Sequence, residues 1–235
     1  MYKEELCFTE HNRIKDKHDA QPQGIRTLGR VQVYAHKIAG SDKELYLLRD
    51  TSNLVVYHGR NWLAQRAFNI NDVTDSGWKD CYVSWLGIGT GGTLEGNPMI
   101  ISSPDLTNTA LATHGVIDSG IRYVTVAGKQ YHKFDDTYPT LTVDSEVSAT
   151  GLGNAYDNKL VMKVVTTLAA DEANDDGGVS DPDAYQMINE AGLFFADVNT
   201  ISPVPTKMEM FARVAFPSIK KNSEVELIFT WYIFF

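Results

Sequence analysis

The chain has few of the features that mark membrane, secreted or metal-binding proteins. Its 235 residues include two cysteines, Cys7 and Cys81, whose spacing suggests neither a zinc site nor a redox pair. No segment approaches the roughly 18 consecutive apolar residues of a membrane span, and the charged N-terminal stretch lacks the apolar core of a signal peptide. We therefore expect two free thiols in a protein made in a cytoplasm.

Positive charge is also scarce. Lysine and arginine number 21 against 30 aspartate and glutamate residues, which gives a formal net charge of −9. Nonspecific binding to nucleic acid requires basic side chains that neutralise phosphates, and anionic membranes repel an acidic chain. We expect neither nucleic acid nor a membrane among the partners.

No catalytic constellation stands out in the sequence. There is no G-x-S-x-G or H-E-x-x-H motif. The paired acids Asp135 and Asp136 lie in turn-forming sequence, and a glycosidase is supported only by the β-rich architecture. The six histidines show no close metal-ligand spacing; they are His11, His18, His36, His58, His114 and His132.

One glycine-rich segment resembles a dinucleotide-binding fingerprint. Gly87 to Gly92 matches G-x-G-x-x-G after a predicted strand. The residues that follow include Gly96, Pro98 and Pro104, which exclude the long helix that must receive the pyrophosphate. We therefore predict no cofactor here, and instead a wide glycine turn with positive φ angles at a sheet edge.

An acidic loop at 171–183 is a weak candidate for a calcium site. The residues at positions 1, 3, 5, 6 and 12 of an EF-hand-like spacing are Glu172, Asn174, Asp176, Gly177 and Asp183. Glutamate at the first position is too long, aspartate at the last is too short, and no amphipathic helices flank the loop. A solvated surface loop is the alternative interpretation.

The remaining pattern predicts an all-β fold. We expect eight to ten strands in a β-sandwich or jelly-roll-like arrangement, with one short helix at about 61–70 that Asn61 caps, because Gly59 should break a helix that starts earlier. IRYVTVAG and KQYHKFDD should form a hairpin joined near Ala127 and Gly128. NKLVMKVVTTLAA (158–170) is compatible with a strand or a helix, and its valines favour a strand. Residues 1–50 are expected to form an extended N-terminal arm with short strands, and residues 51–235 the sandwich domain.

The C-terminal segment VELIFTWYIFF, Val225 to Phe235, is almost wholly apolar. Side chains alternate along a strand, and apolar residues occur on both sides here. Both faces should therefore be covered, by the chain's own sheet or by another subunit. The candidates for an assembly interface are Phe229, Trp231, Tyr232, Phe234 and Phe235.

Four segments, in this order, resemble structural proteins of the tailed-bacteriophage virion. They are NLVVYHGRNWLAQRAF (53–68), VSWLGIGTGGT (83–93), MINEAGLFFAD (187–197) and KMEMFARVAFPSIKKNSEVELIFTWYI (207–233). The resemblance covers about 50–235 and provides no catalytic residues to carry over.

The resemblance implies a non-enzymatic virion component that is made in the host bacterial cytoplasm. Within that class the leading hypothesis is a capsid decoration, or cement, protein. It would stabilise the particle through contacts with other virion proteins and would form a homo-oligomer, possibly a trimer. The alternatives are a neck, collar, tail or baseplate component that mounts fibres, and a host-receptor-binding module.

Overall fold

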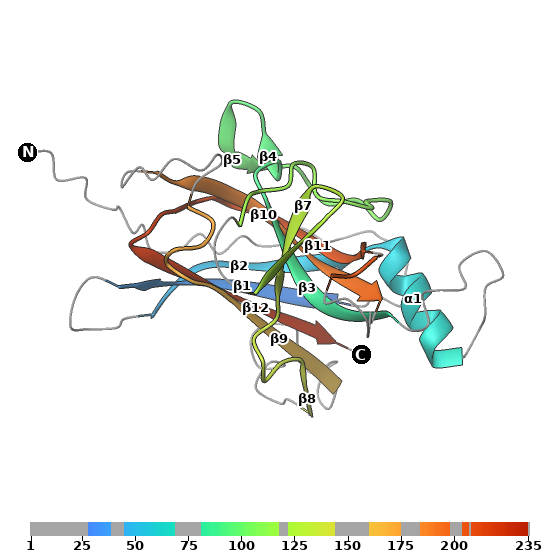
Figure 1. Ribbon diagram of the computed structural model, residues 1–235. Helices are drawn as coiled ribbons and strands as arrows, with labels where there is room; N and C mark the ends of the chain where they lie inside the picture. Colours follow the sequence, from blue (N-terminus) through green and yellow to red (C-terminus); the bar gives the residue numbers. More distant parts are fainter. Residues whose placement is uncertain are drawn as a thin grey trace, which may run out of the picture.

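A computed structural model describes residues 28–38, 45–68, 81–117, 122–143, 160–174, 184–197, 204–206 and 208–234. These residues form mostly β-strands and one short helix (Figure 1), which confirms the predicted fold class. The elements are β1 (Leu28–Lys37), β2 (Leu45–Val55), α1 (Tyr57–Phe68), β3 (Cys81–Gly89), β4 (Thr93–Leu94), β5 (Asn97–Ile101), β6 (Tyr123–Val126), β7 (Lys129–Lys133), β8 (Thr140–Val143), β9 (Leu160–Leu168), β10 (Gln186–Asp197), β11 (Met208–Lys221) and β12 (Val225–Phe234).

Ten strands form one antiparallel sheet in the order β6-β7-β3-β10-β11-β2-β1-β12-β9-β8. The sheet folds over at the joint between β11 and β2, which pair only at Ala212–Val55 and Arg213–Leu54. Beyond this joint the two strands diverge, and the guanidinium of Arg49 donates to the carbonyls of Pro217 and Ser218 at 2.9 and 3.0 Å. Where the backbone pairing between β2 and β11 has ended, the Arg49 side chain connects the two strands.

The main core lies between the two halves of the folded sheet. Apolar side chains from β1, β9 and β12 in one half pack with those from β3, β10 and β11 in the other, as sandwich packing requires. The largest fully buried members are Trp231, Phe195, Phe211, Phe216, Phe229, Leu86, Ile88, Ile117, Leu168 and Ile188.

Strand β12 is a central strand, as its composition predicts. It pairs with β1 on one side and with β9 on the other along almost its whole length. Leu227, Phe229, Trp231 and Ile233 face the core and are at most 1% exposed. The C-terminal strand is therefore buried by its own sheet.

The predicted helix exists but begins earlier than expected. Helix α1 starts at Tyr57, so Gly59 lies in its first turn and Asn61 is not its cap. A Cβ at Gly59 would lie 2.2 Å from the carbonyl oxygen of Phe211. This glycine therefore permits close packing on β11 and does not end a helix. Trp62 then stacks on Phe195 with ring centroids 5.8 Å apart.

The predicted hairpin of β6 and β7 is confirmed. Its turn residues Ala127 and Gly128 have φ values of 51° and 75°, the left-handed conformations that two-residue hairpin turns favour. The strand favoured within residues 158–170 is also confirmed, as β9. Its valines favour an extended backbone.

The expected division at residue 50 falls within β2. Strands β1 and β2, which were assigned to the arm, are neighbours in the middle of the sheet, and β1 pairs directly with β12. Residues 1–27 of the expected arm lie outside the described part of the chain.

Candidate functional site

A buried carboxylate organises one end of the molecule. Glu190, in the middle of β10, is fully buried. Its Oε1 accepts hydrogen bonds from the backbone N–H groups of Gly91 and Thr113 at 3.2 and 3.0 Å. Its Oε2 accepts one from the N–H of Ala112 at 3.1 Å and two from the Arg213 guanidinium at 2.9 and 2.6 Å. The carboxylate thus joins β10, β11, the glycine turn and the loop that follows β5.

The glycine-rich segment serves this packing and has no helix after it. Gly89, Gly91 and Gly92 are not among the described residues with positive φ, so the expected left-handed turn is wrong. A Cβ at Gly92 would lie 2.2 Å from the carbonyl oxygen of Asn189, and one at Gly89 would lie 2.5 Å from that of Thr113. Close backbone approach is the reason for glycine here.

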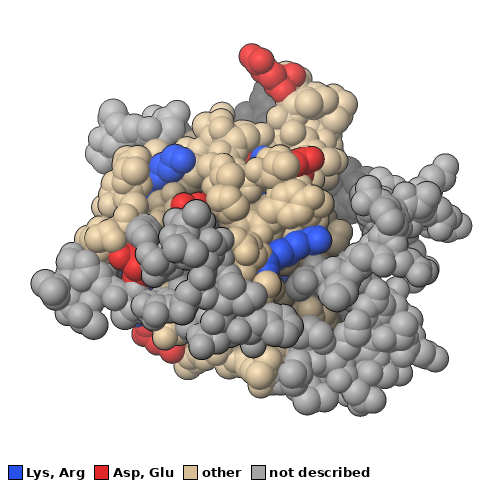
Figure 2. Space-filling model, turned by 90° about the vertical axis from the view of Figure 1, so that its right-hand side faces the viewer, with Lys and Arg blue, Asp and Glu red and all other residues tan. Residues whose placement is uncertain are grey.

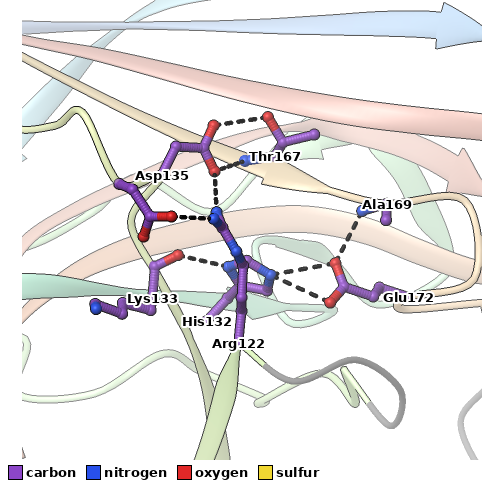
Figure 3. Close-up of polar contacts among 8 residues, drawn as sticks. Arg122, His132, Lys133, Asp135, Thr167, Ala169 and Glu172 are labelled. Carbon is purple, nitrogen blue, oxygen red and sulfur yellow. Dashed lines mark hydrogen bonds and ion pairs between the residues drawn. The ribbon is translucent and has the colours of Figure 1, made fainter.

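A second polar cluster (Figure 3) is centred on His132 of β7. Its Nε2 lies 3.2 and 3.3 Å from the two carboxylate oxygens of Glu172, and its Nδ1 lies 2.7 Å from the carbonyl oxygen of Lys133. Both side chains of the His132–Glu172 pair are at most 5% exposed. Burial raises the pKa of the Glu172 carboxyl, but hydrogen bonds from His132 and from the Ala169 N–H outweigh it, so this pKa lies below its ordinary value.

Asp135 extends the cluster and connects the two halves of the sheet. Its N–H donates to the carbonyl of Val165 on β9 at 3.0 Å. Its carboxylate accepts from the N–H and the hydroxyl of Thr167 at 3.2 and 2.8 Å, and from Arg122 at 3.3 Å. These contacts join the end of β7 to β9, on the side of the sandwich away from the β2–β11 joint. They are structural contacts that close the fold.

Neighbouring acids allow this closure to be tested. We expect Asp135→Ala to lower the free energy of unfolding by about 1–3 kcal/mol, because it leaves the Thr167 N–H without its acceptor. Asp136→Ala removes only an ion pair with Arg122 from a side chain that is 73% exposed. Its effect should stay within about 0.5 kcal/mol. Urea denaturation of both variants measures the difference, and equal losses would contradict a closing role for Asp135.

Two candidate ligands of the acidic loop, Glu172 and Asn174, belong to the described structure, whereas Asp176 and Asp183 lie outside it. Glu172 is bound to His132, as above. The Asn174 amide oxygen accepts from the ammonium of buried Lys221 at 2.7 Å, and Lys221 also donates to two backbone carbonyls. Basic side chains of the chain itself therefore engage both candidate ligands. Within the described ranges, no three His, Cys, Asp or Glu residues are arranged to hold a metal ion.

The predicted assembly residues of β12 lie mostly inside the molecule. Phe229 and Trp231 are 0% exposed and Phe234 is 5% exposed, so the chain's own packing leaves almost no surface of them for another subunit. Tyr232 is half-buried on the outer face of the sheet, where Lys163 lies 5.9 Å from its ring centroid. Phe235 lies outside the described residues.

Exposed apolar surface occurs instead on the β4–β5 hairpin, which projects from the body of the sheet at the top of Figure 1. Leu94, Met99 and Ile100 are 51%, 69% and 47% exposed. The base of the hairpin is held firmly, because the buried side chain of Asn189 accepts from the Gly92 N–H at 2.6 Å and donates to Thr93 Oγ1 at 2.9 Å. A fixed base with an apolar tip suits a contact with another protein.

The sequence analysis did not identify the Glu190–Arg213 pair. A signal exists, because each residue is the single charge within an apolar strand segment, NEAGLFFA in β10 and FARVAF in β11. A charge that must be buried needs a partner, and neighbouring strands of opposite charge offer one. The His132–Glu172 pair has no comparable signal, since 40 residues separate its members.

The described part of the chain contains no helix that is long and apolar enough to cross a membrane. Searches found no matching family model, no matching curated protein and no matching solved structure.

Proposed function

We propose that this protein is a non-enzymatic structural component of a tailed-bacteriophage particle and acts as a capsid decoration protein. The observation that carries the proposal is the β4–β5 hairpin, which presents three apolar side chains on a clamped base. Apolar area that leaves water on binding contributes about 25 cal/mol per Å² before ordering costs. The hairpin is the surface that we assign to the contact with a neighbouring virion protein.

Most of the segments that resemble virion proteins lie together in this fold, which supports the proposal. VSWLGIG forms β3, MINEAGLFFAD forms β10, and FARVAFPSIKK belongs to β11, and these three strands are adjacent in the sheet. The segment that contains α1 packs on β11 through Trp62 and Phe211. These parts form one continuous region, from which the β4–β5 hairpin emerges directly after β3, whereas the last part of the resemblance, β12, lies in the other half of the sheet.

The surface charge also favours a protein partner. Among the described residues on the face shown in Figure 2, most are uncharged, and lysine, arginine and acidic side chains occur as isolated spots. The hairpin itself carries one charged residue, Glu95, and no lysine or arginine. Such a surface suits neither phosphate groups nor an anionic membrane.

Adding the purified protein back to particles that lack it tests the proposal. Particles produced without this gene should lose genome at a lower temperature than complete particles, and the purified protein should restore their heat resistance. Met99→Asp places a charge on the hairpin tip and should weaken binding to the particles at least tenfold, because a buried unpaired charge is costly. Sedimentation with the particles measures this binding.

Glu95→Gln is the matched control on the same hairpin, because it removes a charge and adds none. It should bind like the unmodified protein, and both variants should unfold at the same urea concentration as that protein. Particles that keep full heat resistance without the protein would overturn the decoration role. Full binding by Met99→Asp would show that the hairpin does not take part in the contact.

A further inference from the structure

The imidazole of His114 lies in an environment that suits only its neutral form. It packs against the rings of Tyr131 and Phe194, with centroids 5.3 and 6.0 Å away. Both ring nitrogens are shielded from solvent and have no hydrogen-bond partner among the described residues. Most buried polar groups in proteins have a partner, so this ring is an exception that calls for a reason.

His114 belongs to a loop that covers a second apolar cluster, on the outer face of the sheet. Leu111 of this loop packs with Val56, Tyr131, Phe194 and Met210, and all five are at most 5% exposed. Half-buried residues continue the cluster, namely Trp85, Val124, Val126 and Met208. The loop therefore hides a surface that would be largely apolar if it were uncovered.

The loop is held at two places. In its middle, the N–H groups of Ala112 and Thr113 donate to Glu190, the Thr113 carbonyl accepts from the Thr90 N–H at 2.9 Å, and His114 forms a β-bridge with Gly89. At its end, Gly115 N–H donates to the Ile88 carbonyl at 2.8 Å, and Val116 exchanges two hydrogen bonds of 2.9 Å with the Gln186 side chain. Release of residues 111–114 therefore breaks the first set of contacts and leaves the second set in place.

The charges around His114 offer a proton little support. The positive charge of Lys129, the first residue of β7, disfavours a proton on His114, whereas the carboxylate of Glu190 on β10 favours one. The Glu190 carboxylate is already bound to Arg213 of β11 and to three backbone N–H groups. On β7, the pKa of Tyr131 is raised to about 12, mainly by burial and to a lesser extent by the negative charge of Glu209 on β11. This phenol therefore stays neutral. Glu209 lies 3.3 Å from His58.

We propose that residues 111–114 form an acid-released cover, which detaches when His114 takes up a proton and exposes the apolar cluster around Phe194 and Tyr131.

The direction of the pH effect follows from burial. Burial, and to a lesser extent the positive charge of Lys129, lowers the pKa of His114 to about 4, although the negative charge of Glu190 acts to raise it. In the detached loop the ring is solvated and its pKa returns to about 6.5. The closed form therefore holds fewer protons, and acidification through this window favours the open form. The difference between these two pKa values corresponds to at most about a 300-fold change in the ratio of closed to open molecules. Because the ring is partly exposed, solvent screening reduces this change to tens of fold.

Amide hydrogen exchange of the whole protein, followed by NMR at pH 7 and at pH 4.5, tests the proposal. Protection of the Ala112 and Thr113 amides, corrected for the intrinsic effect of pH, should fall by tens of fold. The Gly115 and Val116 amides should keep their protection, which separates release of the cover from general unfolding. Circular dichroism at both pH values checks that the strands persist.

Two variants assign the effect to His114. His114→Phe and His114→Leu keep an apolar side chain without a titrating group, and in whichever folds the Ala112 and Thr113 amides should stay protected at pH 4.5. His58→Asn, which removes a histidine from α1, should respond like the unmodified protein. An equal loss of protection in the His114 variants, or unchanged protection in the unmodified protein, would overturn the proposal.

Discussion

A chain that ends at Thr230 is expected to yield no folded protein. The truncation removes Trp231, Ile233 and Phe234, which are at most 5% exposed. It also removes the ladder partners of residues 29–31 in β1 and 161–164 in β9. The loss of each large buried side chain costs about 2–5 kcal/mol, and a whole domain is stable by about 5–15 kcal/mol. Three such losses in one strand consume most of that stability.

Circular dichroism and size-exclusion chromatography of the truncated chain measure this outcome. A matched control in the same strand is Tyr232→Ala, whose side chain lies half-buried on the outer face beside Lys163. Its free energy of unfolding should fall by about 1 kcal/mol, and the fold should persist. A soluble truncated protein with cooperative unfolding would show that β12 is dispensable for the fold.

The second large effect is expected for Glu190→Ala. This variant leaves the Arg213 guanidinium buried without its counter-charge, a change that costs about 3–5 kcal/mol. Three backbone N–H groups also lose their acceptor, those of Gly91, Ala112 and Thr113. The urea midpoint should therefore fall strongly, and the loop over β10 should lose its protection from hydrogen exchange.

Two comparisons make this result specific. Glu190→Leu combined with Arg213→Met removes both charges, and it should lose less stability than Glu190→Ala because no unpaired charge remains. Glu226→Ala removes the partner of His36, from a pair whose side chains are 18% and 31% exposed, and should cost at most about 1 kcal/mol. Equal losses in Glu190→Ala and Glu226→Ala would refute the anchoring role of Glu190.

The sequence predicted those strands whose pattern is local. β3, β9, β12 and the β6–β7 hairpin follow from β-branched and aromatic residues or from turn residues, so their prediction required no knowledge of the neighbours. The start of α1 was predicted wrongly, because Gly59 reads as a helix breaker in isolation. Only its approach to the backbone of Phe211 explains it.

The candidate sites were harder to predict because their contacts are distant in sequence. The spacing makes Glu172 only a weak candidate for a calcium ligand, and the fold pairs it with His132. Phe229 and Trp231 were interpreted as assembly residues from their hydrophobicity, which says that a side chain will be buried but not by what. The sequence does not predict the β4–β5 hairpin as an assembly surface, because Leu94, Met99 and Ile100 are recognisable as exposed only once their surroundings are known.

The sequence by itself determined that the chain is all-β, that its last strand is largely buried, and that its net charge is negative, because periodicity and composition are local properties. The tertiary structure decided which surfaces remain free and which charges meet. It placed β12 between β1 and β9, joined Glu190 to Arg213, and left both nitrogens of His114 without partners. The physical reason is that burial and pairing depend on residues far apart in the chain, which only the folding of the sheet on itself brings together.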